Sequence, residues 1–292
     1  MKALVTGASS GMGKDMALYL SNLGYDLYLV SRDYEKIEVL FKDVKTKVTN
    51  ICLDLSDKDN CYKLYEMLKD ENIDILVNNA GFGDAGRFTE TSLDKELNMI
   101  DVNVRAYHIL TKLFLGDFVK KNHGRILNVA SMAGFMPGPY MATYYATKSY
   151  VLNLTLAIYE ELRQMHSNVK ISVLCPGPVK TNFNKVANVK FSIGSLKSDK
   201  VAKYAIDNMF LDKLIIVPGR LMKLNKILAR LLPINFVMFV NSKIQRRKLY
   251  YANFYGLFFY PIANFYQFLF IRNQIYFIYC NYKINVRGYF YF

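Results

Sequence analysis

A tyrosine and a lysine four residues apart, Tyr144 and Lys148, have the types and spacing needed for proton transfer. Side chains at positions i and i+4 of a helix share one face, so the phenol and the ammonium would point into one cleft. A phenol titrates near pH ~10 in water, and a neighbouring cation lowers that pKa by favouring the phenolate. The pair therefore predicts a general acid or base, with Ser131 thirteen residues upstream of Tyr144 as a third polar group.

A glycine-rich loop near the start of the chain has the form of a phosphate-binding turn. An apolar run leads into the sequence TGASSGMG at residues 6–13, and a helical pattern follows. Gly7 permits the tight turn, Gly11 lets the backbone approach a pyrophosphate, and Gly13 allows close contact between strand and helix. The N-terminus of the helix offers N–H groups and the positive end of a dipole to phosphate.

The end of the second predicted strand bears on the choice of nucleotide. An acidic residue there would hydrogen-bond a ribose and favour NAD. Here Ser31 leaves room, and Arg32 offers a bidentate fork for a 2′-phosphate. We therefore predict NADP(H) as the preferred cofactor, with NAD(H) as the alternative. The opposing interpretation is that Arg32 only pairs with Asp33 or Glu35 at the surface.

Taken together, these features resemble the short-chain dehydrogenase/reductase family, of the type with a TGxxxGxG loop and a YxxxK pair. The resemblance runs from residue 2 to about residue 248, and its motifs occur in the expected order. The matching motifs are Asp54-Leu55, NNAG at residues 78–81, Asn103, Ser131 and PGPVKT at residues 176–181. The wider text is similar to bacterial members with broad or unassigned carbonyl and acyl-chain substrates.

The resemblance implies a catalytic set of Asn103, Ser131, Tyr144 and Lys148. Tyr144 would give a proton to a carbonyl as hydride arrives from NADPH, or take one in the reverse direction. Lys148 would lower the pKa of Tyr144 and hold the nicotinamide ribose. Ser131 would hydrogen-bond the substrate oxygen, and Asn103 would anchor a water in the proton path. Tyr145 also lies near Lys148 by position, and the family spacing selects Tyr144.

The resemblance also implies which residues touch the dinucleotide. They follow predicted strands, where ligands of parallel sheets bind. The predicted cofactor-binding residues are Gly7, Ser9, Ser10, Gly11, Met12, Gly13, Ser31, Arg32, Asp54, Leu55, Asn79, Ala80, Gly81, Tyr144, Lys148, Pro176, Gly177, Val179 and Thr181.

Short apolar runs alternate with helical stretches through the first three quarters of the chain. The strand-like runs lie at about residues 2–6, 25–30, 48–53, 73–77, 124–130, 169–175 and 214–217. This alternation predicts an α/β fold, a doubly wound parallel sheet (Rossmann-like) with helices on both faces. We expect a catalytic domain over residues 1–218, a basic amphipathic helical segment over residues 219–248 and an aromatic tail over residues 249–292.

The cysteines and histidines predict neither a disulfide framework nor a metal site. Cys52, Cys61, Cys175 and Cys280 lack ligand spacing, and the three histidines are scattered. Cys52 and Cys175 lie in apolar strands and are expected to be buried thiols, which fits a reducing compartment. The first strand begins at residue 2, so we expect no signal peptide and a cytoplasmic protein.

Apolar side chains cluster in the loops near the predicted catalytic residues. Phe82, Phe88, Phe135, Pro137 and Met141 lie there, and Phe183, Val186, Phe191 and Ile193 fall where the family places a substrate lid. They suggest an apolar substrate, acyl or polyketide-like. The alternative is that these side chains only pack the lid.

Positive charge is concentrated at the C-terminal end. The net charge is +14 for the chain, +2 for residues 1–196 and +12 for residues 197–292. Arg220, Lys223, Lys226 and Arg230 recur at helical spacing, with leucines on another face. This pattern indicates either contact with a membrane surface or a helix packed on the domain with a solvated basic face. Nucleic-acid binding is not expected, because no recognition motif accompanies the charge.

The aromatic tail differs in kind from the rest of the chain. Nineteen of its 44 residues are Tyr or Phe, none is acidic, and the 23 residues Leu249–Ile271 carry no charge. Three interpretations remain open: a membrane anchor on the inner face of the membrane, an extension with no selected function, and a packed part of the fold.

We predict an NADP(H)-dependent oxidoreductase that interconverts a carbonyl and an alcohol on an apolar substrate. The competing class is a non-catalytic dinucleotide-binding sensor or a membrane-associated interaction protein, and the intact catalytic set speaks against it. The resemblance implies a homo-dimer or homo-tetramer, formed through the helices of residues 92–121 and 142–166.

Overall fold

The structure is a computed structural model that describes residues 1–181, 183, 187 and 195–253. The chain divides into a compact unit of residues 1–254 and a second unit of residues 255–292, and every described residue belongs to the first. Most of the predicted lid and tail, including Val186, Phe191, Ile193 and Cys280, lies outside the described residues.

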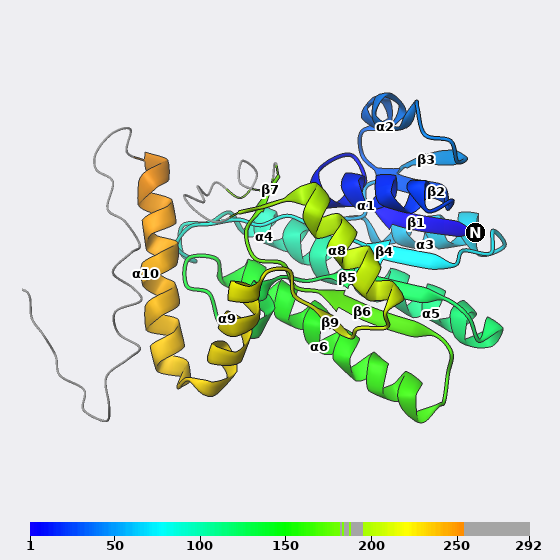
Figure 1. Cartoon of the computed structure of the whole chain (residues 1–292). Coiled ribbons are helices and arrows are strands. Elements are labelled where there is room, and N and C mark those ends of the chain that lie inside the picture. The colour runs from blue at the N-terminus through cyan, green and yellow to red at the C-terminus, as the bar shows by residue number, and fades with distance from the viewer. Residues whose placement is uncertain (182, 184–186, 188–194, 254–292) are drawn as a thin grey trace, which may run out of the picture. The chain divides into compact units, whose positions relative to one another are not determined.

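Seven parallel strands form the central sheet (Figure 1). They are β1 (Lys2–Thr6), β2 (Asp26–Ser31), β3 (Val48–Cys52), β4 (Ile75–Asn78), β5 (Arg125–Val129), β6 (Lys170–Leu174) and β9 (Ile215–Ile216). Their order across the sheet is β3-β2-β1-β4-β5-β6-β9, and every pairing is parallel. All seven predicted strands are present, which confirms the predicted doubly wound fold.

Helices cover both faces of the sheet, because successive strand residues face opposite sides. In β1, Ala3 and Val5 join a core with α1 (Gly11–Asn22), α2 (Tyr34–Phe41) and α8 (Ser198–Phe210). Leu4, between them, joins a second core with α3 (Lys58–Leu68), α5 (Tyr107–Lys121) and α6 (Ala142–Gln164). All three side chains are fully buried. Burial on both faces explains why the strands are almost continuously apolar in sequence.

The strand order places a crevice at the centre of the sheet. The chain runs outward through β1, β2 and β3, then returns to β4 on the other side of β1. Loops at the carboxyl ends of β1 and β4 therefore leave in opposite directions, which opens a crevice between them. The glycine loop follows β1 and residues 79–81 follow β4, so two predicted nucleotide-binding segments flank this point.

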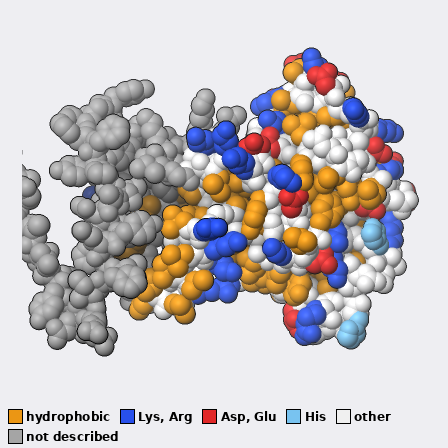
Figure 2. All heavy atoms as spheres, in the orientation of Figure 1, with side chains coloured by type: hydrophobic (Ala, Val, Ile, Leu, Met, Phe, Trp, Pro, Cys, Tyr) orange, Lys and Arg blue, Asp and Glu red, His pale blue; other side chains and the backbone are white. Residues whose placement is uncertain are grey.

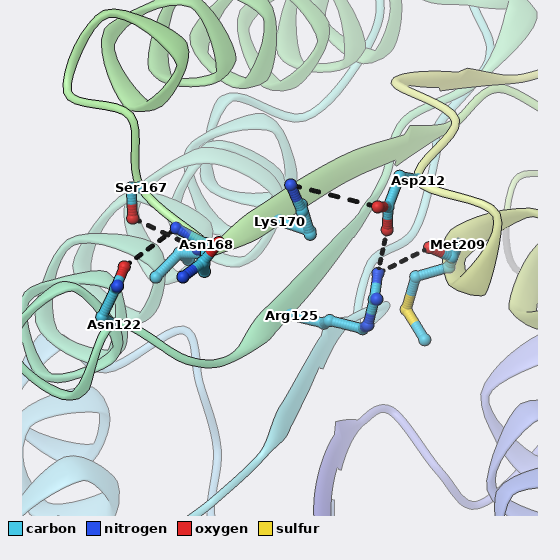
Figure 3. A network of polar contacts seen from close by, with 8 residues as sticks. Asn122, Arg125, Ser167, Asn168, Lys170, Met209 and Asp212 are labelled. Atoms are coloured by element: carbon cyan, nitrogen blue, oxygen red, sulfur yellow. Dashed lines mark hydrogen bonds and ion pairs between the residues drawn. The ribbon is translucent and has the colours of Figure 1, made fainter.

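A polar network lies at the amino ends of β5 and β6, on the side of the sheet opposite to the crevice (Figure 3). Arg125 donates a hydrogen bond of 3.0 Å to the carbonyl oxygen of Met209 and forms an ion pair with Asp212. Lys170 lies 4.0 Å from the same carboxylate. The Asn168 N–H donates to the Asn122 side chain at 2.9 Å. These contacts fix the end of α8 and the residue that follows α5 to the amino ends of β5 and β6, on the side of the sheet far from the crevice.

Two helices follow the last strand, α9 (Arg220–Leu231) and α10 (Ile234–Asn253), with Pro233 between them. No residue of α9 is buried. Within residues 234–246 of α10, where side-chain burial is described, the buried side chains are Val237, Asn241 and Gln245, which recur every four residues and share one face. Within residues 1–181, 183, 187 and 195–253, none of the helices combines the length and the apolar character that crossing a membrane requires.

Two features differ from expectation or were not foreseen. Cys52 is exposed, not buried, because it ends β3 at the edge of the sheet. A small second sheet pairs β7 (Val179–Lys180) with β8 (Leu196–Lys197), and it joins the two ends of the predicted lid segment. Two-residue strands carry no periodic pattern, so the sequence could not predict this pairing.

Candidate active site

The glycine loop is a tight turn between β1 and α1 that has no room for larger residues. Gly7 has a φ of +66°, in the left-handed region that L side chains avoid. A Cβ on Gly13 would lie 2.2 Å from the carbonyl oxygen of Gly7 and 2.4 Å from Nδ2 of Asn79. The start of α1 is therefore held directly against the turn, where a helix N-terminus can bind phosphate.

Asn79 ties the end of β4 to the glycine loop. Its Nδ2 donates to the carbonyl oxygens of Thr6 at 3.0 Å and Gly7 at 3.3 Å. In return, Thr6 Oγ1 accepts from the backbone N–H groups of Asn79 at 2.9 Å and Ala80 at 3.1 Å. These reciprocal bonds hold the two sides of the crevice in one geometry.

A cleft of about 450 Å³ lies at the carboxyl ends of the strands, beside the glycine loop. The predicted cofactor-binding residues that line it are Gly7, Ser9, Ser10, Gly11, Met12, Ser31, Arg32, Asp54, Leu55, Asn79, Ala80, Gly81 and Thr181. Gly13 lies beneath the turn and does not line the cleft. The backbone of the glycine loop fits the pyrophosphate of a dinucleotide, and Arg32 lines the same cleft.

The side chains at the end of β2 leave the Arg32 guanidinium free to contact an anion in the cleft. The Asp33 carboxylate caps α2 and accepts from the Lys36 N–H at 3.0 Å. Arg32 is 74% exposed, and its Nη1 lies 3.8 Å from Oδ2 of Asp54 rather than beside Asp33. An exposed ion pair of this kind contributes little stability. The guanidinium could therefore turn to an anion in the cleft at little cost.

Helix α6 brings Tyr144 and Lys148 to one face, as the sequence predicted. The Lys148 side chain is buried, and its Nζ donates to the carbonyl oxygen of Val129 at 3.0 Å. The same nitrogen lies 6.0 Å from the centroid of the Tyr144 ring and 5.3 Å from that of Tyr107. Loss of water around the ammonium lowers the pKa of Lys148 to about 8.

The pKa of Tyr144 departs from the expected direction. Burial raises it to about 12, and the hydrogen bond with Ser131 opposes that rise. Lys148 was expected to lower this pKa, but it is not among the groups that do so here. The phenol is consequently protonated at neutral pH.

Ser131 is held at the start of a 3-10 turn, η2 (Met132–Phe135), directly after β5. Its Oγ accepts from the Ala133 N–H at 3.1 Å and lies 3.5 Å from the carbonyl oxygen of Pro176. The turn therefore sets the position of the hydroxyl beside the Tyr144 phenol.

Asn103 lies in a six-residue π-helical segment, η1 (Asp101–Ala106), between α4 (Leu93–Ile100) and α5. It is fully buried, and its Nδ2 donates to the Phe82 carbonyl at 2.9 Å and to Thr147 Oγ1 at 3.1 Å. A Cβ on Gly81 would lie 2.8 Å from Asn103 Oδ1 and 3.4 Å from Lys148 Nζ. Asn103 thus fixes the loop after β4 next to Lys148. π-Helical segments of this kind are common at functional sites.

A second cleft, of about 170 Å³, contains the predicted catalytic groups. Ser131, Tyr144 and Lys148 line it together with Pro176, Gly177 and Val179. Met12, Asn79, Gly81, Thr181 and Phe183 line both clefts, so the nucleotide crevice and the catalytic cleft adjoin. Of the predicted site residues, Gly13 and Asn103 line neither cleft. Gly13 packs under the glycine loop, and Asn103 packs against Gly81.

The apolar residues predicted near the reacting centre divide into three groups. Met141 and Phe183 line the catalytic cleft, and the Phe183 ring lies 5.4 Å from that of Tyr144. Phe82 lines the nucleotide cleft. Phe88 is 67% exposed, and Phe135 and Pro137 line a separate groove, so the expectation that these three surround the centre is wrong.

Among the residues of the catalytic cleft that the sequence did not predict, Gln245 is the most distant along the chain. Gln245 of α10 lines this cleft although it lies about 100 positions beyond Tyr144. Its Nε2 donates to the hydroxyl of Tyr145, the residue that competed with Tyr144 by position. The only indication in the sequence is spacing: Gln245 follows Val237 and Asn241 at intervals of four residues, which places all three on one face of a basic, apolar helix.

A family model for short chain dehydrogenases matches residues 1–190. The chain belongs to this family. Among solved structures, a short-chain dehydrogenase from Sphingobium yanoikuyae in complex with NADPH is 26% identical, with a TM-score of 0.71 over 80% of this chain and 96% of that one. The predicted family and the oxidoreductase class are confirmed.

Some relatives in the short-chain dehydrogenase family have names that state their substrates. A very-long-chain 3-oxoacyl-CoA reductase from Mycosarcoma maydis is 34% identical over 63% of this chain and 55% of that protein. A 3-oxoacyl-[acyl-carrier-protein] reductase from Buchnera aphidicola is 31% identical over 64% of this chain and 77% of that protein. The chain spans about half the length of the first of these relatives.

Proposed function

We propose that this chain is an NADP(H)-dependent reductase that converts the ketone of an apolar acyl substrate to an alcohol. The observation that carries the proposal is the shared wall of the two clefts. A nicotinamide at the inner end of the glycine-loop cleft would lie beside Met12, Gly81 and Thr181, which also border the cleft of Tyr144.

The proposed roles follow from the geometry of the side chains. The nicotinamide, when bound, supplies the hydride. Tyr144 is protonated at neutral pH and donates the proton that the carbonyl oxygen needs. Ser131, hydrogen-bonded to Tyr144, offers a second contact to the same oxygen as charge develops on it. Lys148 lies beside the phenol, and Asn103 holds the loop that borders both.

Arg32 supports the choice of NADP(H) over NAD(H). It lines the nucleotide cleft, and the carboxylate that could have opposed a 2′-phosphate, Asp33, is occupied at the start of α2. The neighbouring structure from Sphingobium yanoikuyae contains NADPH. A second neighbour, from Burkholderia phymatum, contains NAD, the alternative cofactor.

The lining of the catalytic cleft supports an apolar substrate. Met141, Val179 and Phe183 contribute apolar side chains beside Tyr144. The relatives named above are 3-oxoacyl reductases, and a 3-oxoacyl thioester has both a ketone and an apolar chain. We therefore assign this substrate class to the chain.

The test is NADPH oxidation by the full-length protein with 3-oxoacyl thioesters of increasing chain length. We expect kcat/KM to rise with chain length. Equal turnover of small polar ketones and long-chain thioesters would remove the acyl assignment. Tight NADPH binding with no turnover of any ketone would favour a non-catalytic nucleotide sensor instead.

We also propose that α9 and α10 contact an anionic membrane surface. Leu221, Leu224, Ile227 and Leu231 of α9 are between 48% and 75% exposed. Residues 213–253 contain nine Lys or Arg and no acidic residue. Figure 2 shows Lys and Arg side chains beside hydrophobic ones where α9 lies in Figure 1. Exposed apolar side chains among basic ones are typical of helices that lie in a membrane interface.

Sedimentation with vesicles tests this contact. The full-length chain should sediment with vesicles that contain phosphatidylserine and stay in solution with phosphatidylcholine alone. The double substitution Leu224→Glu with Leu231→Glu should abolish sedimentation while NADPH binding is retained. Sedimentation unchanged by that substitution would show that α9 is not the contact. The proposed homo-dimer or homo-tetramer is tested separately by light scattering without vesicles.

A further inference from the structure

Gln245 is a buried polar residue that reaches the proposed catalytic cleft from a helix outside the matched family segment. The family model ends at residue 190, and α10 begins at Ile234. Gln245 nevertheless lines the cleft of Ser131 and Tyr144. It is 3% exposed, whereas its neighbour Ile244 is 46% exposed.

The inward face of α10 is unusual in its chemistry. A helix normally buries its apolar side chains and exposes its polar ones. Here Asn241 and Gln245 are buried, while Phe236 and Phe239 are 52% and 57% exposed. Buried amides are costly unless they are hydrogen-bonded. Two of them on one face therefore indicate a specific polar arrangement.

That arrangement holds the amide of Gln245 in one orientation. Its Nε2 donates to the Tyr145 hydroxyl and lies 3.4 Å from Oδ1 of Asn241. The Tyr145 hydroxyl lies 3.4 Å from the same oxygen, and Asn241 Nδ2 donates to the Pro137 carbonyl at 2.7 Å. Both N–H groups of Gln245 are thus directed toward Tyr145 and Asn241, which leaves the amide oxygen on the opposite side.

The amide oxygen of Gln245 is buried and has no hydrogen-bond partner within the part of the chain that the structure describes. An unpaired buried oxygen is unfavourable, because it has lost its hydrogen bonds to water without gaining others. Since the network fixes the nitrogen of this amide, rotation cannot relieve the oxygen without losing other bonds. A ligand in the cleft that brings a donor would recover this energy.

We propose that Gln245 is a specificity-determining residue, which accepts a hydrogen bond from a neutral donor on the substrate. This inference rests on the proposed carbonyl reductase function and adds the substrate chemistry. An amide oxygen accepts from an N–H or an O–H and disfavours a carboxylate. The preferred substrate therefore carries an amide N–H or a hydroxyl in addition to the ketone that faces Tyr144. The network places this acceptor next to Tyr145, whose ring lies 6.1 Å from that of Tyr144.

Two matched substrate pairs test the proposal with the full-length wild-type protein. The first pair is a 3-oxoacyl N-acetylcysteamine thioester and the same thioester methylated on the amide nitrogen. The second is a hydroxyketone and its methoxy analogue. We expect at least one donor-bearing member to have a kcat/KM five-fold or more above its methylated partner. This comparison needs no variant, so it does not depend on the folding of a mutant.

The substitution Gln245→Met then assigns the preference to this residue. Methionine is close in size and has no comparable acceptor, so the ratio within the preferred pair should fall to about one. The Ile244→Ala control, on the exposed face of α10, should keep the wild-type ratio. The proposal is overturned if wild type treats both pairs alike, or if Gln245→Met keeps the preference.

The same assay separates this inference from the function on which it rests. Turnover of both members of each pair at equal kcat/KM would leave a reductase without the proposed specificity. NADPH binding with no turnover of any of the four compounds would contradict the reductase function and this assignment together.

Discussion

The Nζ of Lys148 lies 6.0 Å from the centre of the Tyr144 ring, and the buried lysine and the half-buried tyrosine line the same cleft. Burial moves the two pKa values apart, since it lowers that of Lys148 to about 8 and raises that of Tyr144 to about 12. Each shift favours the neutral form of its group. In the absence of nucleotide, the site is therefore best described as a neutral phenol beside an ammonium that is readily deprotonated.

Stability should depend on pH through Lys148. Its folded-state pKa of about 8 lies below the unfolded value of 10.5, so the buried ammonium destabilises the fold below pH 8, and this cost disappears toward pH 10.5. The substitution Lys148→Met should raise the free energy of unfolding at pH 7 by about 2 kcal/mol. About 3 comes from the pKa shift, and about 1 is lost with the hydrogen bond to Val129.

Denaturant unfolding at pH 7 and pH 9.5 measures this effect. The stabilisation by Lys148→Met should fall by more than half between the two pH values. Lys200→Met, at an exposed position of α8, should show no such change. A Lys148→Met protein less stable than wild type at pH 7 would refute the assigned cost of burial.

The two directions of the reaction should respond differently to pH. Alcohol oxidation needs the Tyr144 phenolate, whose population rises as pH approaches the raised pKa. Carbonyl reduction needs the phenol, which stays populated throughout. We expect kcat/KM for oxidation to increase from pH 6 to pH 9, while the loss of the reduction rate is smaller than threefold. An oxidation rate that is flat above pH 6 is incompatible with Tyr144 as the base at this pKa.

The packing beneath the glycine loop predicts a large effect from one methyl group. In Gly13→Ala, the Cβ would meet the Gly7 oxygen at 2.2 Å and the Asn79 amide at 2.4 Å, so the turn must shift. We expect NADPH affinity to fall at least ten-fold, with a loss of about 1–3 kcal/mol in unfolding free energy.

Gly116→Ala is the matched control for the glycine loop. Gly116 lies within α5 with open space around its Cβ position. Alanine there should stabilise the protein by about 0.5–1 kcal/mol and leave NADPH binding unchanged. Fluorescence titration and thermal unfolding give both quantities. Equal NADPH affinities for the two variants would rule out the proposed cradle.

Nucleotide preference should reside in Arg32. Arg32→Leu removes the charge that would meet a 2′-phosphate and leaves Ser31 and the capped Asp33 in place. We expect the Kd for NADPH to rise ten-fold or more and that for NADH to change less than two-fold, because a charge-assisted contact contributes about 1.5–3 kcal/mol. If both affinities change equally, Arg32 does not select the phosphate.

The sequence could predict the sheet and most of the cleft because each depends on local pattern. Seven apolar runs became the seven strands, and the motif residues follow those strands at the carboxyl edge. The pairing of Asn79 with Thr6 and Gly7 was not foreseen in detail, yet it follows from β4 lying next to β1.

What the sequence could not predict depends on burial and on distant contacts. The direction of the Tyr144 pKa shift was missed because spacing reveals a nearby cation but not the removal of water. Gln245 was missed because it reaches the site from α10, and nothing local connects it to Tyr144. Phe88 was placed at the site by its position in the chain, whereas its side chain is exposed.

The central claim is that Tyr144 is the proton donor in a nucleotide-dependent reduction. The most direct test compares full-length wild type with Tyr144→Phe, with NADPH binding followed by its own fluorescence, since the chain contains no Trp. We predict equal NADPH affinity and a decrease of 10²–10⁴-fold in thioester reduction for the variant. Tyr145→Phe should keep most of the wild-type turnover. Full turnover by Tyr144→Phe, or no binding of either nucleotide by folded wild type, would contradict the account.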